Sequence, residues 1–348
     1  MGLGSFFKSS SASDDITRAG FELANCNVDC DDCHTNFPRS VKFQDDDGKQ
    51  LWKSTKPYGL HLVISTGKVD WQHNALDNKS SLEALVDKFL ESYSFPDGEI
   101  KVSVSSIAPS STHHHQDDDH KIQYGDILIL PFFVWVRNIT KDNVADVLTK
   151  LLPSLVKERE LHPTTTNGHQ NLINANSTTN GISNNKPLVN VNQDPSEVLA
   201  SLSTFSKLLI NLSFVSSDYL EDGSNVDVSV DNSYAYVFLC SHSTRDKRCG
   251  ITAPIMKKEF EFHLRDFDLY RDASDSRPNG VKIAFINHVG GHKFAANVLM
   301  YTKKLGKNIW LARCKPNNVK PIIEQSLLLG KVWPQKVRIV QQFKGIEW

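Results

Sequence analysis

The fold of this chain is decided by two stretches, YAYVFLCSHSTRDKRC at residues 234–249 and VKIAFINHVGGH at residues 281–292. Each begins with an apolar, β-branched and aromatic run that predicts a buried strand. Cys240 ends the first strand and Cys249 closes the polar loop behind it, whereas His288 ends the second strand and His292 follows four residues later. Since an α/β sheet presents its chemistry in the loops after the strands, both loops can converge at one end of the sheet.

Thiolate and imidazole are ligands that zinc, copper and iron–sulfur centres select. The turn between the two histidines contains Gly290 and Gly291, which let the backbone turn tightly beside a bulky inorganic centre. Cationic side chains surround both loops and are expected to lower the pKa of the thiols and to dock an acidic redox partner. These are Arg245, Lys247, Arg248 and Lys293.

Three alternatives to an iron–sulfur site stay open. A zinc-stabilised Cys2His2 binding module without a redox role suits His-x3-His, but Cys-x8-Cys is wider than the usual gap of about two to four residues. A thiol or phosphoryl-transfer enzyme would use Cys240, yet Arg245 comes one position too early for a Cys-x5-Arg phosphatase loop. The plainest alternative is a buried strand cysteine with hydrogen-bonded loop histidines. A [2Fe–2S] cluster accommodates the wide cysteine pair best.

Composition excludes several other classes. The formal net charge of −1 gives no electrostatic case for a nucleic-acid partner or an anionic membrane. The apolar run at 127–136 is too short to cross a bilayer and contains Pro131. The first residues lack the features of a targeting peptide, which predicts a cytoplasmic or nuclear protein whose cysteines are thiols or metal ligands.

Length and periodicity predict an α/β protein (an α+β sandwich) with two thioredoxin-like halves. We expect strands at 59–65, 100–104 and 127–135 with helices at 80–90 and 141–155, then strands at 234–240, 281–287, 297–301 and 308–314 with helices at 253–266 and 320–328. The predicted segments are a disordered arm (1–54) holding Cys26, Cys30 and Cys33 as exposed thiols, an N-terminal thioredoxin-like α/β domain (55–160), a disordered Asn/Ser/Thr-rich insertion (161–196), a helix and linker (197–232) and a C-terminal thioredoxin-like domain with its tail (233–348).

Several motifs resemble the fungal sucrase/ferredoxin-like family over most of residues 55–348. They are DWQHNA at 70–75, CSHSTRDKRCGITAP from 240, YRDASD at 270–275, GVKIAF from 280 and NHVGGHKFAANV from 287. The resemblance implies a thioredoxin-like [2Fe–2S] ferredoxin, a redox protein rather than an enzyme with its own substrate, and a link to actin patches and stress tolerance. Its implied ligands are Cys240, Cys249, His288 and His292.

Histidine ligation sets further expectations for such a cluster. Neutral imidazole in place of thiolate leaves less negative charge on the centre, so the potential should lie above that of all-cysteine ferredoxins, in the Rieske direction. The free ring nitrogens should couple electron transfer to protons, with a potential that falls as pH rises near neutrality.

The C-terminal residues Ile346, Glu347 and Trp348 resemble the short tail by which clients are recognised by the cytosolic iron–sulfur assembly targeting complex. A free carboxylate beside an exposed indole is a suitable recognition element, although a terminal Trp packed on its own domain is the simpler alternative. The expected partners are therefore that complex and an unidentified redox protein.

Overall fold

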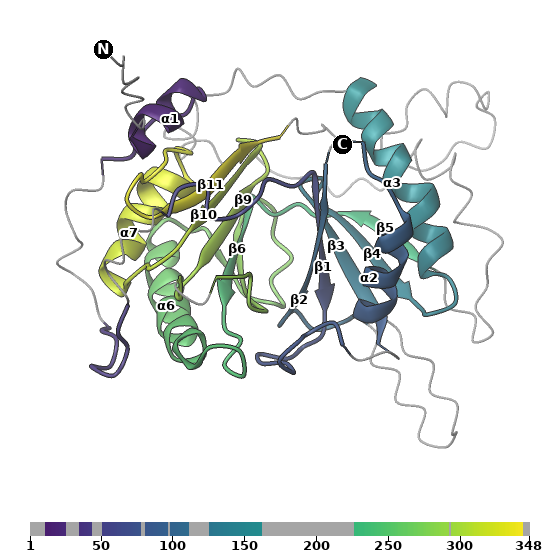
Figure 1. Cartoon of the computed structure of the whole chain (residues 1–348), viewed down its shortest axis with the longest axis horizontal. Coiled ribbons are helices and arrows are strands. Elements are labelled where there is room, and N and C mark those ends of the chain that lie inside the picture. Colours follow the sequence, from purple (N-terminus) through teal and green to yellow (C-terminus); the bar gives the residue numbers. More distant parts are fainter. Residues whose placement is uncertain are drawn as a thin grey trace, which may run out of the picture.

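The computed structural model describes residues 11–25, 35–43, 51–77, 81–96, 98–110, 125–161, 226–291 and 294–343. Its strands form one mixed sheet in the order β11-β10-β9-β6-β8-β2-β1-β3-β4-β5, with β7 paired to β8. Helices α6 and α7 flank one end of the molecule, and α2 and α3 flank the other (Figure 1). This arrangement confirms the predicted α/β class and is consistent with thioredoxin-like halves.

The first half of the sheet is built on β1, which is parallel to β2 and antiparallel to β3. Its elements are β1 (Leu60–Ser65), α2 (Leu82–Ser92), β2 (Ile100–Ser105), β3 (Gly125–Leu130), β4 (Val134–Ile139), α3 (Val144–Leu161) and β5 (Asp227–Val230). The single strand expected at 127–135 is in fact two, because the chain turns at 131–133 and returns as β4. Pro131, which lacks a backbone N–H, lies in that turn.

The second half is built on β6, which is parallel to β8 and antiparallel to β9. Its elements are β6 (Ala235–Cys240), α6 (Lys247–Asp266), β7 (Tyr270–Arg271), β8 (Val281–Ile286), β9 (Val298–Thr302), β10 (Lys307–Leu311), η1 (Pro316–Asn318), α7 (Val319–Pro321), η2 (Ile322–Leu327) and β11 (Val337–Gln342). The sequence does not predict β7 or β11. None of the described helices is long and apolar enough to cross a membrane.

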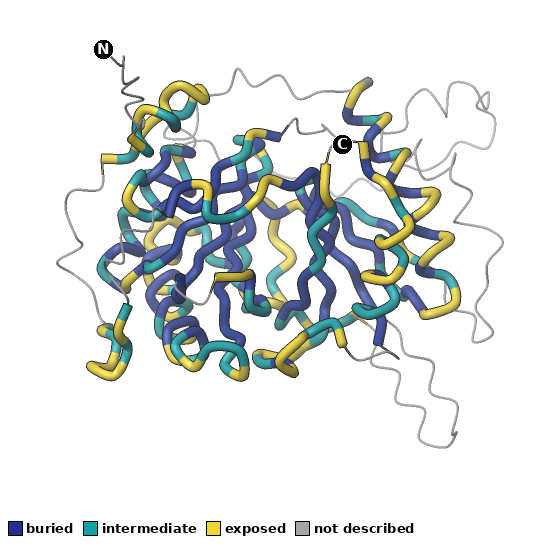
Figure 2. Tube along the Cα trace, in the orientation of Figure 1, coloured by how far each residue is buried: buried dark blue, intermediate teal, exposed yellow. Residues whose placement is uncertain are grey.

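Three apolar clusters hold these layers together. One lies between the first half-sheet and α2 and α3, and a second lies between the other half-sheet and α6 and α7. The third joins the two half-sheets and includes Leu130 from β3, Phe238 from β6 and Trp310 from β10. Figure 2 shows that the strands are mostly buried and the exposed residues lie largely on helices and loops. The half-sheets also meet directly, since Ser105 pairs with Ile286.

Part of the segment predicted as a disordered arm is ordered. Helix α1 (Ala12–Arg18) begins with a capping box in which Ser11 and Asp14 satisfy each other's backbone N–H groups. Its Ile16 is fully buried in the second cluster, and Leu23 forms a bridge with Val332. The other segment boundaries stay predictions, because residues 1–10 and 162–225 lie outside the described residues.

Helix α6 begins at Lys247, six residues before the predicted start at 253. Asp246 caps it by accepting a hydrogen bond from the N–H of Arg248 (3.0 Å), so Cys249 lies in the first helical turn rather than at the end of a loop. Pro254, one residue after the predicted start, lies inside the helix. Gly250 packs against Ser243, where a Cβ would lie 2.6 Å from the serine Cβ.

Candidate metal centre

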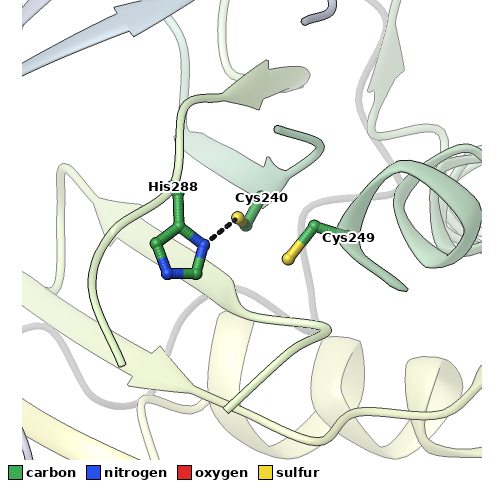
Figure 3. Close-up of side chains that lie close together, drawn as sticks. All are labelled: Cys240, Cys249 and His288. Carbon is green, nitrogen blue, oxygen red and sulfur yellow. Dashed lines mark hydrogen bonds between the residues drawn. The ribbon is translucent and has the colours of Figure 1, made fainter. Parts of the chain in front are cut away.

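Three of the four predicted ligands come together at one end of the second half-sheet. Cys240 ends β6, Cys249 lies in the first turn of α6, and His288 follows β8. The two sulfur atoms and a ring nitrogen all lie within 4.8 Å of one another, and Figure 3 shows the three side chains converging. Cys240 Sγ is 3.8 Å from His288 Nδ1. His292 lies outside the described residues.

The sheet register explains this convergence. Because β6 and β8 are adjacent and parallel, with Cys240 paired to Ile286, the chain leaves both strands at the same edge. The Ser241 N–H donates to the Ile286 carbonyl (3.1 Å), which keeps the two exits side by side. The capped start of α6 then returns Cys249 to the same point.

Both cysteines are inside the protein and His288 is at its boundary. Cys240 is 1% exposed and Cys249 is 0% exposed, whereas His288 is half-buried. The cysteines are free thiols. The hydrogen bond with Cys240, together with burial, raises the pKa of the Cys249 thiol.

The expected lowering of the thiol pKa by the basic loop is therefore wrong for Cys249. Arg248 is held by Asp246 in an ion pair of 2.8 Å, so the charge of its guanidinium is largely compensated. Arg245 contacts the exposed His73 ring at 2.8 Å, and Lys247 is exposed. Lys293 lies outside the described residues.

The donor set fits a borderline-soft metal centre. Two thiols and an imidazole at this spacing match the ligands that zinc and iron–sulfur centres use, and the group contains no carboxylate of the kind that magnesium or calcium prefers. The buried thiols and the half-buried imidazole give the centre one protected side and one accessible side. The residues present therefore fit either a [2Fe–2S] cluster or zinc, with His292 as the expected fourth ligand.

A pocket of about 370 Å³ opens on the His288 side of the centre. Its walls come from both halves of the chain: His73, Asn74, Ala75, His242, Arg245, Asn287, His288 and Gly290. A partner or small molecule in this pocket would therefore meet the His288 imidazole, and the buried thiols would remain behind it.

Sequence reasoning missed His242, which links the centre to the first half of the chain. Its Nδ1 accepts the N–H of His288 (3.2 Å), so its Nε2 carries the proton that is donated to the Trp71 carbonyl (3.1 Å). The His242 side chain is almost fully buried, and burial lowers its pKa. The neutral ring thus sets the position of the His288 backbone. The sequence feature that could have identified His242 is its position between Cys240 and Cys249.

The loop at 69–73 completes this link. Thr244 donates from its N–H and its hydroxyl to Asp70, at 3.1 and 2.8 Å, and the Ser241 hydroxyl donates to the Val69 carbonyl at 2.6 Å. In the structure Trp71 is buried, whereas His73 faces the centre's pocket.

The remaining predicted sites cannot be placed. Cys26, Cys30 and Cys33 lie outside the described residues, as do the tail residues Ile346, Glu347 and Trp348. The sixth cysteine, Cys314, is buried elsewhere, and burial raises its pKa to about 12.

Comparison with known proteins places this geometry in a family. The chain is 31% identical over 325 residues to Actin patches distal protein 1 of Saccharomyces cerevisiae, covering 90% of this chain and 85% of that protein. Altered inheritance of mitochondria protein 32 of Meyerozyma guilliermondii is 32% identical over 102 residues, which is 29% of this chain and 33% of the relative. The protein of that name from Debaryomyces hansenii is 32% identical over 97 residues, covering 28% and 32%. No solved structure matches the chain. Residues 51–339 match the family described as Sucrase/ferredoxin-like, and the chain belongs to that family.

Proposed function

We propose that this chain is a [2Fe–2S] redox protein that transfers or senses single electrons. Its ligands are Cys240, Cys249, His288 and His292. The observation that carries the proposal is the meeting of two buried thiols and one half-buried imidazole within 4.8 Å. The ferredoxin-like family supports the same assignment.

The bound cluster would supply one-electron chemistry, and the surrounding residues determine from which side a redox partner can approach the cluster. Cys240 and Cys249 hold one side of the centre away from solvent, whereas His288 borders the pocket. A redox partner would therefore exchange electrons across the histidine edge. The proton coupling expected of imidazole ligands stays a prediction.

An acidic redox partner would dock beside this pocket. Arg245 lines it, and Lys247 is exposed on the adjoining turn. Arg248 contributes less than the sequence suggested, because Asp246 compensates its charge. Charge reversal at Arg245 and Lys247 should slow reduction by an acidic electron donor and weaken its dependence on ionic strength. Reversal at Arg248 is the matched comparison, with a smaller expected effect on the rate.

A zinc-stabilised module is the second candidate, because the donor set fits zinc equally well. The two candidates differ in colour, metal and sulfide. We would purify the full chain without oxygen and measure its visible absorption, iron, zinc and acid-labile sulfide. An iron–sulfur protein is red-brown, whereas a zinc protein is colourless.

Variants then test the ligands individually. Cys240→Ser, Cys249→Ser, His288→Ala and His292→Ala should each lose most of the iron and sulfide. Cys314→Ser is the matched control, since Cys314 is also a buried free thiol but is not part of the group. Equal iron loss from the control variant would contradict the assignment of ligands.

Cluster delivery and cellular role complete the proposal. The tail Ile346-Glu347-Trp348 would be recognised by the cytosolic iron–sulfur assembly targeting complex, in the cytoplasm or nucleus. Deleting these three residues should lower iron content in cells while leaving chemical reconstitution in vitro unchanged. The name of the yeast relative mentions actin patches, and we extend that link and a role in stress tolerance to this chain. In yeast lacking the relative, this chain should restore patch distribution and its Cys240→Ser variant should not.

A further inference from the structure

Arg338 on β11 is a buried cation beside the proposed metal centre. It is 2% exposed, and its guanidinium lies between the rings of Phe294 and Trp310, 4.9 Å from each centroid. Nη1 donates to the Gly290 carbonyl (3.1 Å) and to Asn297 Oδ1 (3.0 Å), while Nε donates to Ser54 Oγ (3.0 Å). Its hydrogen bonds are therefore largely satisfied by neutral acceptors.

Among the residues that the structure describes, the charge of Arg338 has no carboxylate partner, and its hydrogen bonds go to Ser54, Gly290 and Asn297. A second cation, the half-buried Lys101, lies over the same Trp310 ring, 5.3 Å from its centroid. Burial lowers the pKa of Arg338 to about 10 and, with help from Arg338, that of Lys101 to about 8. A buried positive charge without a carboxylate partner is costly, so the fold must gain something from keeping Arg338 in this position. Cys240 opposes the effect of burial by raising the pKa of Arg338.

The hydrogen bonds of Arg338 lead to both ligand segments. Gly290 is two residues beyond His288 and belongs to the turn that precedes His292. Asn297 uses its backbone carbonyl to accept the N–H of Cys240 (3.2 Å). Gly291 leaves room for the Phe294 ring on which Arg338 stacks, because a Cβ there would lie 2.7 Å from that ring. One side chain thus connects the end of β6 with the turn after β8.

We propose that Arg338 is a positioning residue that clamps the Cys240 and His288 segments and supplies the counter-charge of the centre. The inference rests on the proposed function. Two ferric ions, two sulfides, two thiolates and two neutral imidazoles sum to zero charge. One electron taken from an external donor makes the centre −1. A fixed positive charge stabilises the reduced form over the oxidised form and raises the midpoint potential.

The expected size follows from Coulomb's law. At an effective permittivity of about 20, two unit charges about 12 Å apart change an equilibrium about tenfold. The hydrogen bond to Gly290, two residues beyond His288, places the guanidinium at about that distance from the centre. Loss of the charge should shift the equilibrium between the oxidised and reduced centre about tenfold toward the oxidised form, which is about 59 mV for one electron.

The test compares variants of the full chain by potentiometric titration of the cluster and by Co²⁺ binding to the metal-free protein. Arg338→Gln should lower the midpoint potential, and Arg338→Lys, which keeps a charge, should largely restore it. Both should weaken Co²⁺ binding, because both lose the forked contact with Gly290 and Asn297. When Co²⁺ binds to two thiols and two protons are released, the net charge of the site does not change. The Co²⁺ affinity therefore measures how well Arg338 positions the ligand segments, whereas the midpoint potential of the cluster measures the effect of its charge.

Two further variants keep the test decisive if Arg338→Gln folds poorly. Ser54→Asp places a carboxylate against Arg338 without removing it, and should also lower the potential. Arg137→Gln is the control, since Arg137 also stacks on an indole but lies on β4 and pairs with Asp227. An unchanged potential in Ser54→Asp and Arg338→Gln overturns the charge role, and unchanged Co²⁺ affinity in both Arg338 variants overturns the clamp. A wild-type chain that binds neither iron nor Co²⁺ overturns the proposed function itself.

Discussion

Replacing His242 with leucine should destabilise the chain by about 3 kcal/mol. The substitution removes the acceptor of the His288 N–H, a partly buried hydrogen bond, and the donor to the Trp71 carbonyl, a buried one. Each buried polar group left without a partner costs roughly 1–3 kcal/mol, and leucine restores neither bond while filling much of the ring's volume. Loss of the edge-on contact with Trp71, at 5.7 Å between centroids, adds about 0.5–1.5 kcal/mol. Partial relaxation of the loop brings the expected total to about 3 kcal/mol.

Two polar substitutions separate the bonds. His242→Asn offers an oxygen near the position of Nδ1 and should keep the His288 bond, whereas His242→Gln offers an amide near Nε2 and should keep the Trp71 bond. Each polar variant should recover about half of the stability that His242→Leu loses. Only the asparagine variant should retain wild-type metal affinity, since its bond fixes the ligand segment.

Urea unfolding of the metal-free chain measures the stability, and Co²⁺ titration measures the affinity. His73→Leu is the control, because His73 is an exposed wall of the same pocket, and it should change stability by less than about 0.5 kcal/mol. A leucine variant at position 242 within that same limit would refute the reasoning, as would equal metal affinity in the asparagine and glutamine variants.

Two other predictions follow from buried geometry. His61 is fully buried, faces Tyr301 and Lys101, and has its pKa lowered well below the usual value by burial and by the lysine. The unfolded chain therefore binds more protons than the folded chain below about pH 6.5, and the free energy of unfolding should fall with acidification by up to about 1.4 kcal/mol per pH unit. In His61→Gln this slope should be smaller. An unchanged slope, measured by urea unfolding at several pH values, would contradict this. Gly291 and Gly290 both have positive φ, but a Cβ at Gly291 would lie 2.7 Å from the Phe294 ring, whereas one at Gly290 meets nothing within 4 Å. Gly290→Ala should cost only the backbone strain of about 1–2 kcal/mol in the free energy of unfolding. Gly291→Ala should cost clearly more and should also lower Co²⁺ affinity more. Equal effects of the two variants would exclude the clash with Phe294.

The sequence predicts the strands and their chemistry because those signals are local. The apolar run of β6 is buried along its whole length and that of β8 is buried or half-buried, and the candidate ligands Cys240 and His288 stand at their ends. Parallel pairing of the two strands then brings Cys240 and His288 to one edge.

The start of α6 could not be predicted from propensity alone. Gly250 and Pro254 are typical helix breakers, yet the Asp246 cap begins the helix before them. Gly250 is needed for close packing with Ser243, and tertiary contact therefore overrides local preference.

Contacts that join distant segments were also beyond local patterns. The His242 bridge to Trp71 spans 171 positions, and Arg338 reaches Gly290 across 48. Helix α1 likewise depends on burial of Ile16 against the far end of the chain. A polar or isolated residue has no periodicity that identifies such a partner.

The most direct test of the metal centre is the iron and acid-labile sulfide content of the full chain purified without oxygen, read together with its visible and electron paramagnetic resonance spectra. We predict about two irons and two sulfides per chain, and a resonance that appears on one-electron reduction. Stoichiometric zinc without sulfide, or a colourless protein free of both metals, would contradict the account.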